Sequence, residues 1–561
     1  MIHPLPRQLG SVAVILTLLL TAPRLHGQRA TAGPAPSRLL VILVVDQMRA
    51  DYVQRFQRDW SGGLKRLFSK GAWFTKAAYP YLETYTCAGH ATIATGAFPH
   101  VHGIFQNAWY DRERDASMAC TDDPSAAPVT YSGRAGSYGP RLLQAPTLGD
   151  ELRAQRPTRL VSVALKARSA IMLAGHGGDA VTWMSEANDG WQTSTAFASE
   201  PVAPVKAFVD ANPVEADYGK TWTLSLPRDR YREPDDGEAE APGAGWTRTF
   251  PHALTDPSGR PGKQFYDLWQ RSPFADEYVG RMAASLAEQM RLGRPGTTDI
   301  LAVSFSSPDL LGHQFGPNSQ EIHDTYVRLD RTVGRLLTRL DSLVGKDRYV
   351  VALSADHGVT EIPEQLQRRG VSAGRLASAA FTDIAQRAAE SVLGPGTYVA
   401  RVTANDVYFR PGVHEQLRQQ PAALAAVVDA LAAQPGIARV FRADELVNAT
   451  DSSDPERRAA ALSYVPGRSG AIVMSPKAGW VFATTGATHG SATSNDQRVP
   501  LVFFGTGIKR GSYPEAATPA DLAPTLAALV GLTLPRAEGR TLSSALRTPV
   551  SRGTRDAAGA R

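Results

Sequence analysis

Acidic and imidazole side chains stand where several buried, strand-like runs of this sequence end. They are Asp46 after LVILVV, Asp309 after LAVSFSSP, and the adjacent Asp356 and His357 after YVVALSA. Ligands bind beyond the carboxyl ends of the strands in an open parallel sheet, so these side chains are expected to meet at one site. A single acid at a strand end is usually a turn residue or a helix cap. Several acids together with histidine instead predict a metal site.

The spacing of these residues also suits metal binding. Asp309 and His313 stand at i and i+4, so at the start of a helix both would project from one face and share one metal ion. Asp356 and His357 are adjacent and can both be ligands where the strand has ended. His489 lies in a loop rich in glycine and threonine before another buried run. The sequence has two cysteines and no C-x-x-C pair, so carboxylates and imidazoles would hold the metal.

The segment YLETYTCAGHATIATG offers a nucleophile. Thr86 stands at the start of an expected helix, where free backbone N–H groups and the helix dipole favour an anion. A hydroxyl beside a metal ion can become an alkoxide nucleophile. On its own, Thr86 fits an ordinary helix N-cap better.

Strand-like runs alternate with helical segments along the chain. The run RLLVILVVDQ is typical of a strand buried on both faces, and similar runs are RLVSVAL, TDILAVSFS, RYVVALSADHG and RVPLVFFGTG. Amphipathic helical periodicity follows at 321–344 and 521–532. This alternation predicts an α/β fold with a mostly parallel central sheet and helices on both faces.

One catalytic domain at 38–548 is expected to account for most of the 561 residues. Two less regular regions, about 210–262 and about 364–468, predict insertions that form embedded caps. The tail at 549–561 is predicted to be disordered.

The N-terminus has the features of an export signal. A basic residue precedes an apolar run from Ser11 to Ala22, and small and polar residues follow it. The run is shorter than the about 20 residues that a membrane span needs. We therefore predict a signal peptide at 1–27, a linker at 28–37 and a periplasmic or secreted protein without stable membrane insertion; an uncleaved anchor is the alternative. Export would let Cys87 and Cys120 form a disulfide, with two free thiols as the alternative.

The composition excludes some classes of protein. With 43% hydrophobic and 20% charged residues, the chain can bury a large core. The net charge is +6, but lysine and arginine are interleaved with acids along the chain. No nucleic-acid partner is therefore expected, although a basic balance helps to attract anionic substrates.

Six motifs in this order resemble the alkaline phosphatase superfamily. They are VVDQMRADY, TYTCAGHATIATG, VHGIFQNAWYD, SPDLLGHQFGP, LSADHG, and THGS followed by RVPLVFFG. Within the superfamily they most resemble the phosphate-irrepressible alkaline phosphatases with a threonine nucleophile, which are related to nucleotide pyrophosphatase/phosphodiesterases. The resemblance covers nearly the whole chain after the export signal. It implies a monomeric alkaline phosphatase that hydrolyses small-molecule phosphate monoesters.

The resemblance also implies two zinc ions and a set of site residues. The ligands of one ion would be Asp309, His313 and His489, and those of the other Asp46, Asp356 and His357, with Thr86 bridging to it. Thr86 would attack phosphorus and form a covalent phospho-threonine, which water would then hydrolyse. Three residues would contact the phosphoryl group: Asn107, Lys166 and Arg168. Two cations suit a doubly charged monoester, because arginine binds two oxygens and lysine neutralises charge.

Three alternative functions share parts of this pattern. A sulfatase would need the motif C/S-x-P-x-R, but Cys87 is followed by AGHA, so that chemistry is missing. A phosphodiesterase or nucleotide pyrophosphatase would keep the metals and Thr86. Its substrate carries one negative charge fewer at phosphorus, so Lys166 and Arg168 argue against it. A non-catalytic phosphate- or metal-binding protein would not need a threonine between the metal and the helix.

Overall fold

The computed structural model of the chain describes residues 37–185 and 189–547. The predicted signal peptide at 1–27 and tail at 549–561 lie outside these residues, as does the predicted linker at 28–37 except for Ser37. Within the described ranges, no helix is both long enough and apolar enough to cross a membrane.

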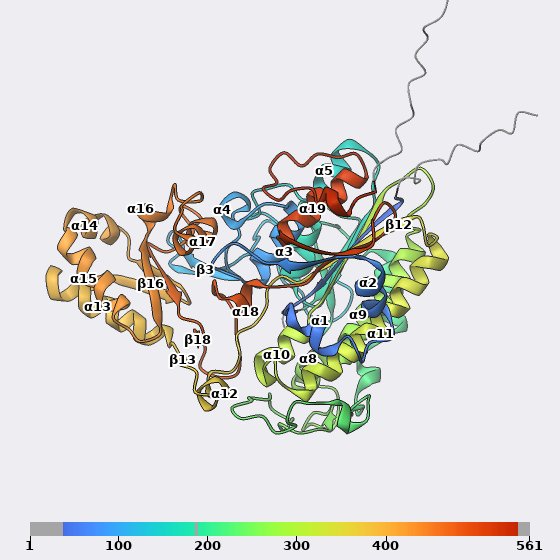
Figure 1. The fold of residues 1–561 in the computed structure, drawn as a ribbon, viewed down its shortest axis with the longest axis horizontal. Helices are drawn as coiled ribbons and strands as arrows, with labels where there is room; N and C mark the ends of the chain where they lie inside the picture. The colour runs from blue at the N-terminus through green and yellow to red at the C-terminus, as the bar shows by residue number, and fades with distance from the viewer. Residues whose placement is uncertain (1–36, 186–188, 548–561) are drawn as a thin grey trace, which may run out of the picture. The chain divides into compact units, whose positions relative to one another are not determined.

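A ten-stranded sheet forms the centre of the described chain (Figure 1). Its five middle strands are mutually parallel and lie in the order β12 (Tyr349–Ser354), β1 (Leu39–Val45), β11 (Asp299–Phe305), β6 (Leu160–Ala164) and β7 (Ala180–Met184). Beyond β12 come β19 (Leu501–Gly505), β2 (Ala72–Ala77) and β20 (Gly511–Ala517), and beyond β7 come β8 (Trp191–Ser194) and β5 (Pro128–Thr130).

Two strands of this sheet run against the others. β19 is antiparallel to both of its neighbours, and so is β8, whereas β2 and β20 pair in parallel. The remaining strands therefore share one direction. The predicted α/β fold with a mostly parallel sheet is confirmed, with antiparallel strands toward its edges.

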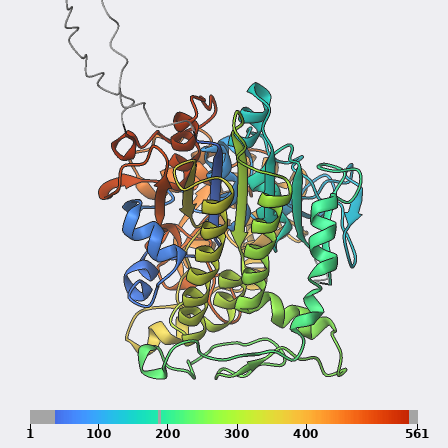
Figure 2. The ribbon, with the colours of Figure 1, turned by 90° about the vertical axis from the view of Figure 1, so that its right-hand side faces the viewer.

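Strand β1 shows why a continuous apolar run is needed here. All seven of its residues are buried, and alternate side chains enter two different cores. Leu39, Val41, Leu43 and Val45 pack in the core that holds helices α2 (Gly63–Lys70), α9 (Pro273–Gln289) and α11 (Gln320–Leu343). Leu40, Ile42 and Val44 pack in the core that holds α3 (Thr86–Thr95), α6 (Ala167–Ala174) and α19 (Leu522–Leu529). Figure 2 shows α9 and α11, in yellow-green, in front of the sheet.

The first predicted insertion, 210–262, is mostly loop. It holds one short strand pair, β9 (Thr221–Trp222) with β10 (His252–Ala253). Asp324 on α11 anchors it, because the carboxylate accepts hydrogen bonds from Trp222 Nε1 at 2.7 Å and from the Tyr231 hydroxyl at 2.6 Å.

The second insertion is a small α/β unit with a core of its own, drawn in orange in Figure 1. Its sheet has the order β14 (Val399–Thr403), β15 (Asp406–Phe409), β17 (Ile472–Pro476) and β16 (Ile437–Arg442). Its helices are α13 (Ser378–Leu393), α14 (Val413–Gln419), α15 (Pro421–Ala432), α16 (Ala443–Leu446) and α17 (Pro455–Ser463). Strand β17 lies after the expected boundary at 468, so the unit extends further along the chain than the sequence indicated. We call residues 374–481 the cap.

Candidate metal centre and nucleophile

Four adjacent strands of the sheet supply the acidic centre. Asp46 follows β1, and Asp356 with His357 follows β12. Asp309 lies in helix α10 (Ser307–Phe315), which begins two residues after β11, and Lys166 follows β6. Because these strands are parallel neighbours, their carboxyl ends bring residues distant in sequence to one place.

The acids and histidines form two groups that can each hold a metal ion. In one, ligand atoms of Asp46, Asp356 and His357 lie within 4.8 Å of one another, and in the other those of Asp309, His357 and His489 do. His357 therefore belongs to both groups. Its ring stacks on that of His489, with centroids 3.5 Å apart.

His313 lies beside the second group, where the sequence places it as a ligand. Its Nε2 is 3.2 Å from Asp309 Oδ1, and Nε2 of His489 is 3.6 Å from the same oxygen. The His313 side chain is 37% exposed, whereas that of His489 is 4% exposed. His313 thus approaches Asp309 from the solvent side of the centre.

Each of the three histidines is oriented by its own backbone contact. Nδ1 of His357 lies 2.9 Å from the backbone carbonyl of Gly358. Nδ1 of His313 lies 2.8 Å from the carbonyl of Ala487, and Nδ1 of His489 lies 2.8 Å from that of Thr84. A carbonyl only accepts, so Nδ1 carries a proton in each ring, and Nε2 is the nitrogen that each histidine can offer to a metal. Burial lowers the pKa of His357 to about 3, which keeps its ring neutral. Burial alone would also lower the pKa of His313, but the contact with Asp309 outweighs it and raises the pKa. Neutral imidazoles held in this way are typical metal ligands.

The carboxylates carry more negative charge than their surroundings neutralise. Burial, together with Asp309 and Asp356, raises the pKa of Asp46 well above its ordinary value. Asp46 Oδ1 and Asp356 Oδ2 are buried and accept no hydrogen bond of good geometry from the described residues, although Nε2 of His357 lies 3.5 Å from the first and 3.4 Å from the second. An unpaired buried carboxylate oxygen is costly unless a cation or donor meets it. The residues present therefore fit divalent cations bound by nitrogen and oxygen ligands.

Lys166 lies between the two groups. Its Nζ is 2.6 Å from Asp46 Oδ2 and 2.5 Å from Asp309 Oδ2, and the residue is 7% exposed. Burial alone would lower the pKa of Lys166, but these two carboxylates outweigh it and raise the pKa. Lys166 is therefore a charged side chain that touches one acid of each group.

Thr86 is the first residue of α3 and is buried. Its Oγ1 lies 3.4 Å from Nε2 of His357, the imidazole that both groups share. The positive end of the helix dipole lies at the same place. The hydroxyl thus has the surroundings that favour an oxyanion.

The three residues expected to contact a phosphoryl group line one cavity of about 210 Å³. Arg168 lies in α6, two residues after Lys166, and Asn107 directly precedes β3 (Ala108–Asp111). The Oδ1 of Asn107 accepts a hydrogen bond from the backbone N–H of Cys87 at 2.9 Å. Asn107 is thereby tied to the residue that follows Thr86.

Two residues of the centre were missed from the sequence. Gln47 donates from Nε2 to Asp309 Oδ1 at 2.7 Å and from its backbone N–H to Asp356 Oδ1 at 3.1 Å, with φ at +66°. His90 lies with Nδ1 at 2.8 Å from the Thr86 carbonyl and 3.3 Å from Asp356 Oδ2. The only indication in the sequence is proximity to predicted site residues. Gln47 adjoins Asp46, and His90 lies one helical turn after Thr86.

The fold and this centre define a metal-dependent hydrolase, with acids and imidazoles for cations beside the buried hydroxyl of Thr86. The family model "Type I phosphodiesterase / nucleotide pyrophosphatase" matches residues 40–497. The chain belongs to this family, within the alkaline phosphatase superfamily.

Relatives of known class extend over nearly the whole chain. Alkaline phosphatase PafA of Elizabethkingia meningoseptica is 32% identical, over 93% of this chain and 96% of its own length. Alkaline phosphatase PhoK of a Sphingomonas species is 32% identical, over 90% of this chain and 91% of its own length. The chain is accordingly an enzyme of the alkaline phosphatase class, as the motifs predicted.

Solved structures agree with this assignment. The crystal structure of PafA matches with a TM-score of 0.83 at 30% identity, covering 91% of this chain and 99% of that one. A PafA variant in which one threonine, one asparagine, one lysine and one arginine are replaced matches with a TM-score of 0.84. Murine ectonucleotide pyrophosphatase/phosphodiesterase 5, at 14% identity and a TM-score of 0.54, shares the fold.

Proposed function

We propose that this enzyme hydrolyses phosphate monoesters with two zinc ions and a covalent phospho-threonine at Thr86. The observation that carries the proposal is the position of Thr86 Oγ1, 3.4 Å from Nε2 of His357, the residue common to both metal groups. A hydroxyl between two cation sites and a helix N-terminus is suited to attack phosphorus.

The ligand set supports zinc. One ion would be held by Asp46, Asp356 and His357, and the other by Asp309, His313 and His489. These oxygen and nitrogen ligands, without thiolates, suit zinc. When bound, the two ions supply positive charge to the attacking and leaving oxygens of an in-line displacement.

Thr86 carries the covalent step. A bond forms between Thr86 Oγ1 and phosphorus as the bond from phosphorus to the ester oxygen breaks, which releases the alcohol. Water then attacks phosphorus, phosphate leaves and the threonine hydroxyl is restored. The backbone carbonyl of Thr86 contacts His90 Nδ1 at 2.8 Å, and this contact holds the first turn of α3 beside Asp356.

Asn107, Lys166 and Arg168 are proposed to bind the phosphoryl oxygens that face away from the metals. They line the same cavity, which supports a common ligand. Together with Thr86 they are the same four residue types, in the same order, as those replaced in the PafA variant. Lys166 also contacts Asp46 and Asp309, and a cation bound by these acids would compete for them and leave the ammonium to the substrate.

Phosphodiester hydrolysis is the second candidate, because the matching family model describes phosphodiesterases. A diester carries an organic group where a monoester carries a charged oxygen. Two cations in the cavity therefore favour the monoester.

Export as a monomeric protein completes the proposal. It is supported by the apolar run from Ser11 to Ala22, and the disulfide between Cys87 and Cys120 suits an oxidising compartment. An intact N-terminus on membrane-embedded protein would contradict cleavage of the signal peptide and release of a soluble enzyme.

The covalent step is tested by trapping the phospho-enzyme. Wild-type protein is mixed with 4-nitrophenyl phosphate, quenched in acid and digested, and the Thr86 peptide is examined by mass spectrometry. We expect added phosphate on Thr86 in the wild type, none in Thr86→Ala, and added phosphate again in the matched control Thr86→Ser. Near-normal turnover by Thr86→Ala would show that water attacks the ester directly.

A further inference from the structure

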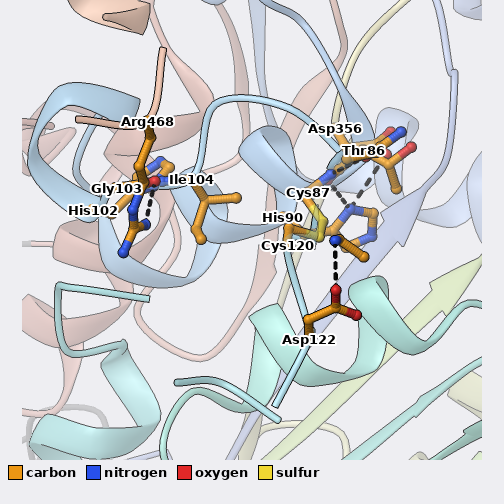
Figure 3. Close-up of a disulfide and its surroundings, with 12 residues drawn as sticks. Thr86, Cys87, His90, His102, Gly103, Ile104, Cys120, Asp122, Asp356 and Arg468 are labelled. Carbon is orange, nitrogen blue, oxygen red and sulfur yellow. Dashed lines mark hydrogen bonds and ion pairs between the residues drawn. A yellow bond between two sulfur atoms is a disulfide. The ribbon is translucent and has the colours of Figure 1, made fainter. Parts of the chain in front are cut away.

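A disulfide joins the nucleophile helix to the hairpin that follows it. Cys87, directly after Thr86, is bonded to Cys120, which follows β4 (Ala116–Ala119) (Figure 3). Both cysteines are buried, at 0% and 1% exposure. The predicted pairing is confirmed.

Asn107 lies between the two half-cystines and contacts both. Its side-chain Oδ1 accepts from the Cys87 N–H at 2.9 Å, and its backbone carbonyl accepts from the Cys120 N–H at 2.9 Å. Two hydrogen bonds therefore link Asn107 to the two cysteines, and the disulfide links the cysteines to each other. They fix both its backbone and its side chain relative to Thr86.

The contact with Cys87 decides which end of the Asn107 amide is available. Because Oδ1 accepts from a backbone N–H, the amide NH₂ group points away from Cys87. Asn107 and Cys120 line the same cavity as Lys166 and Arg168. The NH₂ group is therefore the donor that Asn107 can offer to a ligand there.

We infer that the Cys87–Cys120 disulfide is a positioning element of the active site, which holds the Asn107 amide in register with Thr86. The inference rests on the proposed role of Asn107 in binding the phosphoryl group. Two groups that contact the same phosphoryl group act well only at fixed separation, and misplacement by about 1 Å can cost about 10²-fold in rate. The disulfide restricts that separation.

A second contact, independent of the disulfide, holds the segment that leads into this hairpin. Gln106 donates from Nε2 to Glu83 Oε1 at 2.9 Å and to Asp406 Oδ2 at 2.8 Å, the latter in the cap. Removal of the sulfurs should therefore loosen Asn107 without releasing the whole segment. A stabilising role alone would instead act on the unfolded chain, by closing a loop between residues 33 apart in sequence.

A double-mutant cycle separates the two roles. The variants are C87A/C120A, N107A and the triple variant, measured as zinc-loaded enzymes with 4-nitrophenyl phosphate well below their unfolding temperatures. We expect C87A/C120A to lower kcat/KM about tenfold in the wild-type background and less than twofold in the N107A background, because coupled residues are not additive. If N107A is itself impaired and C87A/C120A lowers kcat/KM equally in both backgrounds, the positioning role of the disulfide is overturned while the proposed role of Asn107 stands. If N107A retains wild-type kcat/KM, the proposed phosphoryl contact fails, and this inference fails with it.

Reduction of the wild type keeps the test valid if the alanine variants fold poorly. A dithiol supplies two electrons and two protons, leaves two cysteine thiols and becomes a cyclic disulfide itself. Activity should fall on reduction, return on reoxidation and be insensitive to the dithiol in N107A. Full activity of the reduced enzyme, with both thiols shown to be alkylated after unfolding, contradicts the inference.

Discussion

Lys166 Nζ lies 2.6 Å from Asp46 Oδ2, so an ammonium occupies the edge of a proposed metal site. The same ammonium reaches Asp309 in the other group at 2.5 Å. The residue that the motifs assign to the substrate thus also neutralises the acids that would bind the metals. These two roles give opposite expectations for metal affinity and for activity.

Replacement of Lys166 should strengthen metal binding while it weakens catalysis. Lys166→Met removes the cation that competes for Asp46 and Asp309 and leaves both buried carboxylates without an ammonium beside them, which favours a bound metal. We expect zinc affinity, measured by competition with a fluorescent chelator, to rise about tenfold or more. Arg168→Met is the matched control, since it removes a cation from the same cavity, and its zinc affinity should stay near that of the wild type. Equal affinities in the two variants would contradict the competition.

Metal removal should destabilise the protein as well as inactivate it. The centre holds three buried acids, Asp46, Asp309 and Asp356, against one ammonium, so its charge is balanced best with cations bound. At a zinc concentration about 100 times Kd, binding should raise the free energy of unfolding by about 2.7 kcal/mol. Thermal unfolding with and without chelator measures this, with Asp46→Asn as a variant in which the difference shrinks. Identical unfolding curves for wild type with and without zinc would oppose a metal site here.

Glu240 should make the stability depend on pH. It is 7% exposed, neither of its carboxylate oxygens accepts a hydrogen bond from residues 37–185 or 189–547, and burial raises its pKa to about 8. The folded state therefore prefers the neutral acid, so stability is full below the ordinary pKa of 4.5 and is lost as the pH rises through 8. Glu240→Gln should leave the free energy of unfolding unchanged near pH 4 and raise it by roughly 2 kcal/mol at pH 9.

Denaturant titrations at the two pH values measure the effect of Glu240→Gln. The exposed Glu113 provides the control, and Glu113→Gln should show no such pH-dependent gain. If Glu240→Gln raised the free energy of unfolding equally at pH 4 and pH 9, the Glu240 carboxyl would not ionise between these pH values, which would contradict the prediction.

Much of the centre follows from local sequence, because the first charged residue after a strand that is buried on both faces lies beyond the carboxyl end of that strand. Asp46, Asp309 and Asp356 were predicted in this way. Asn107, Lys166 and Arg168 were assigned only through the resemblance, since a lone K-x-R or a turn asparagine has many ordinary explanations.

Contacts between distant segments were not predictable from local patterns. The stacking of His357 on His489, which gives one imidazole to both groups, depends on where two loops meet. The end of the cap was placed too early for the same reason, because β17 pairs with β15 and β16 across long stretches of sequence. The antiparallel direction of β19 likewise depends on its partners, since its apolar run is the same in either direction.

The central claim, that this enzyme is a monoesterase because of the cations in its cavity, is tested most directly by one ratio. We would measure kcat/KM for 4-nitrophenyl phosphate and for methyl 4-nitrophenyl phosphate in the wild type and in Lys166→Ala/Arg168→Ala. At about 1.5–3 kcal/mol for each charge-assisted hydrogen bond, the double substitution should lower the monoester value by about 10²-fold or more and the diester value much less. The monoester-to-diester ratio should therefore collapse. An unchanged ratio, with both substrates affected equally, would contradict the account and favour the phosphodiesterase.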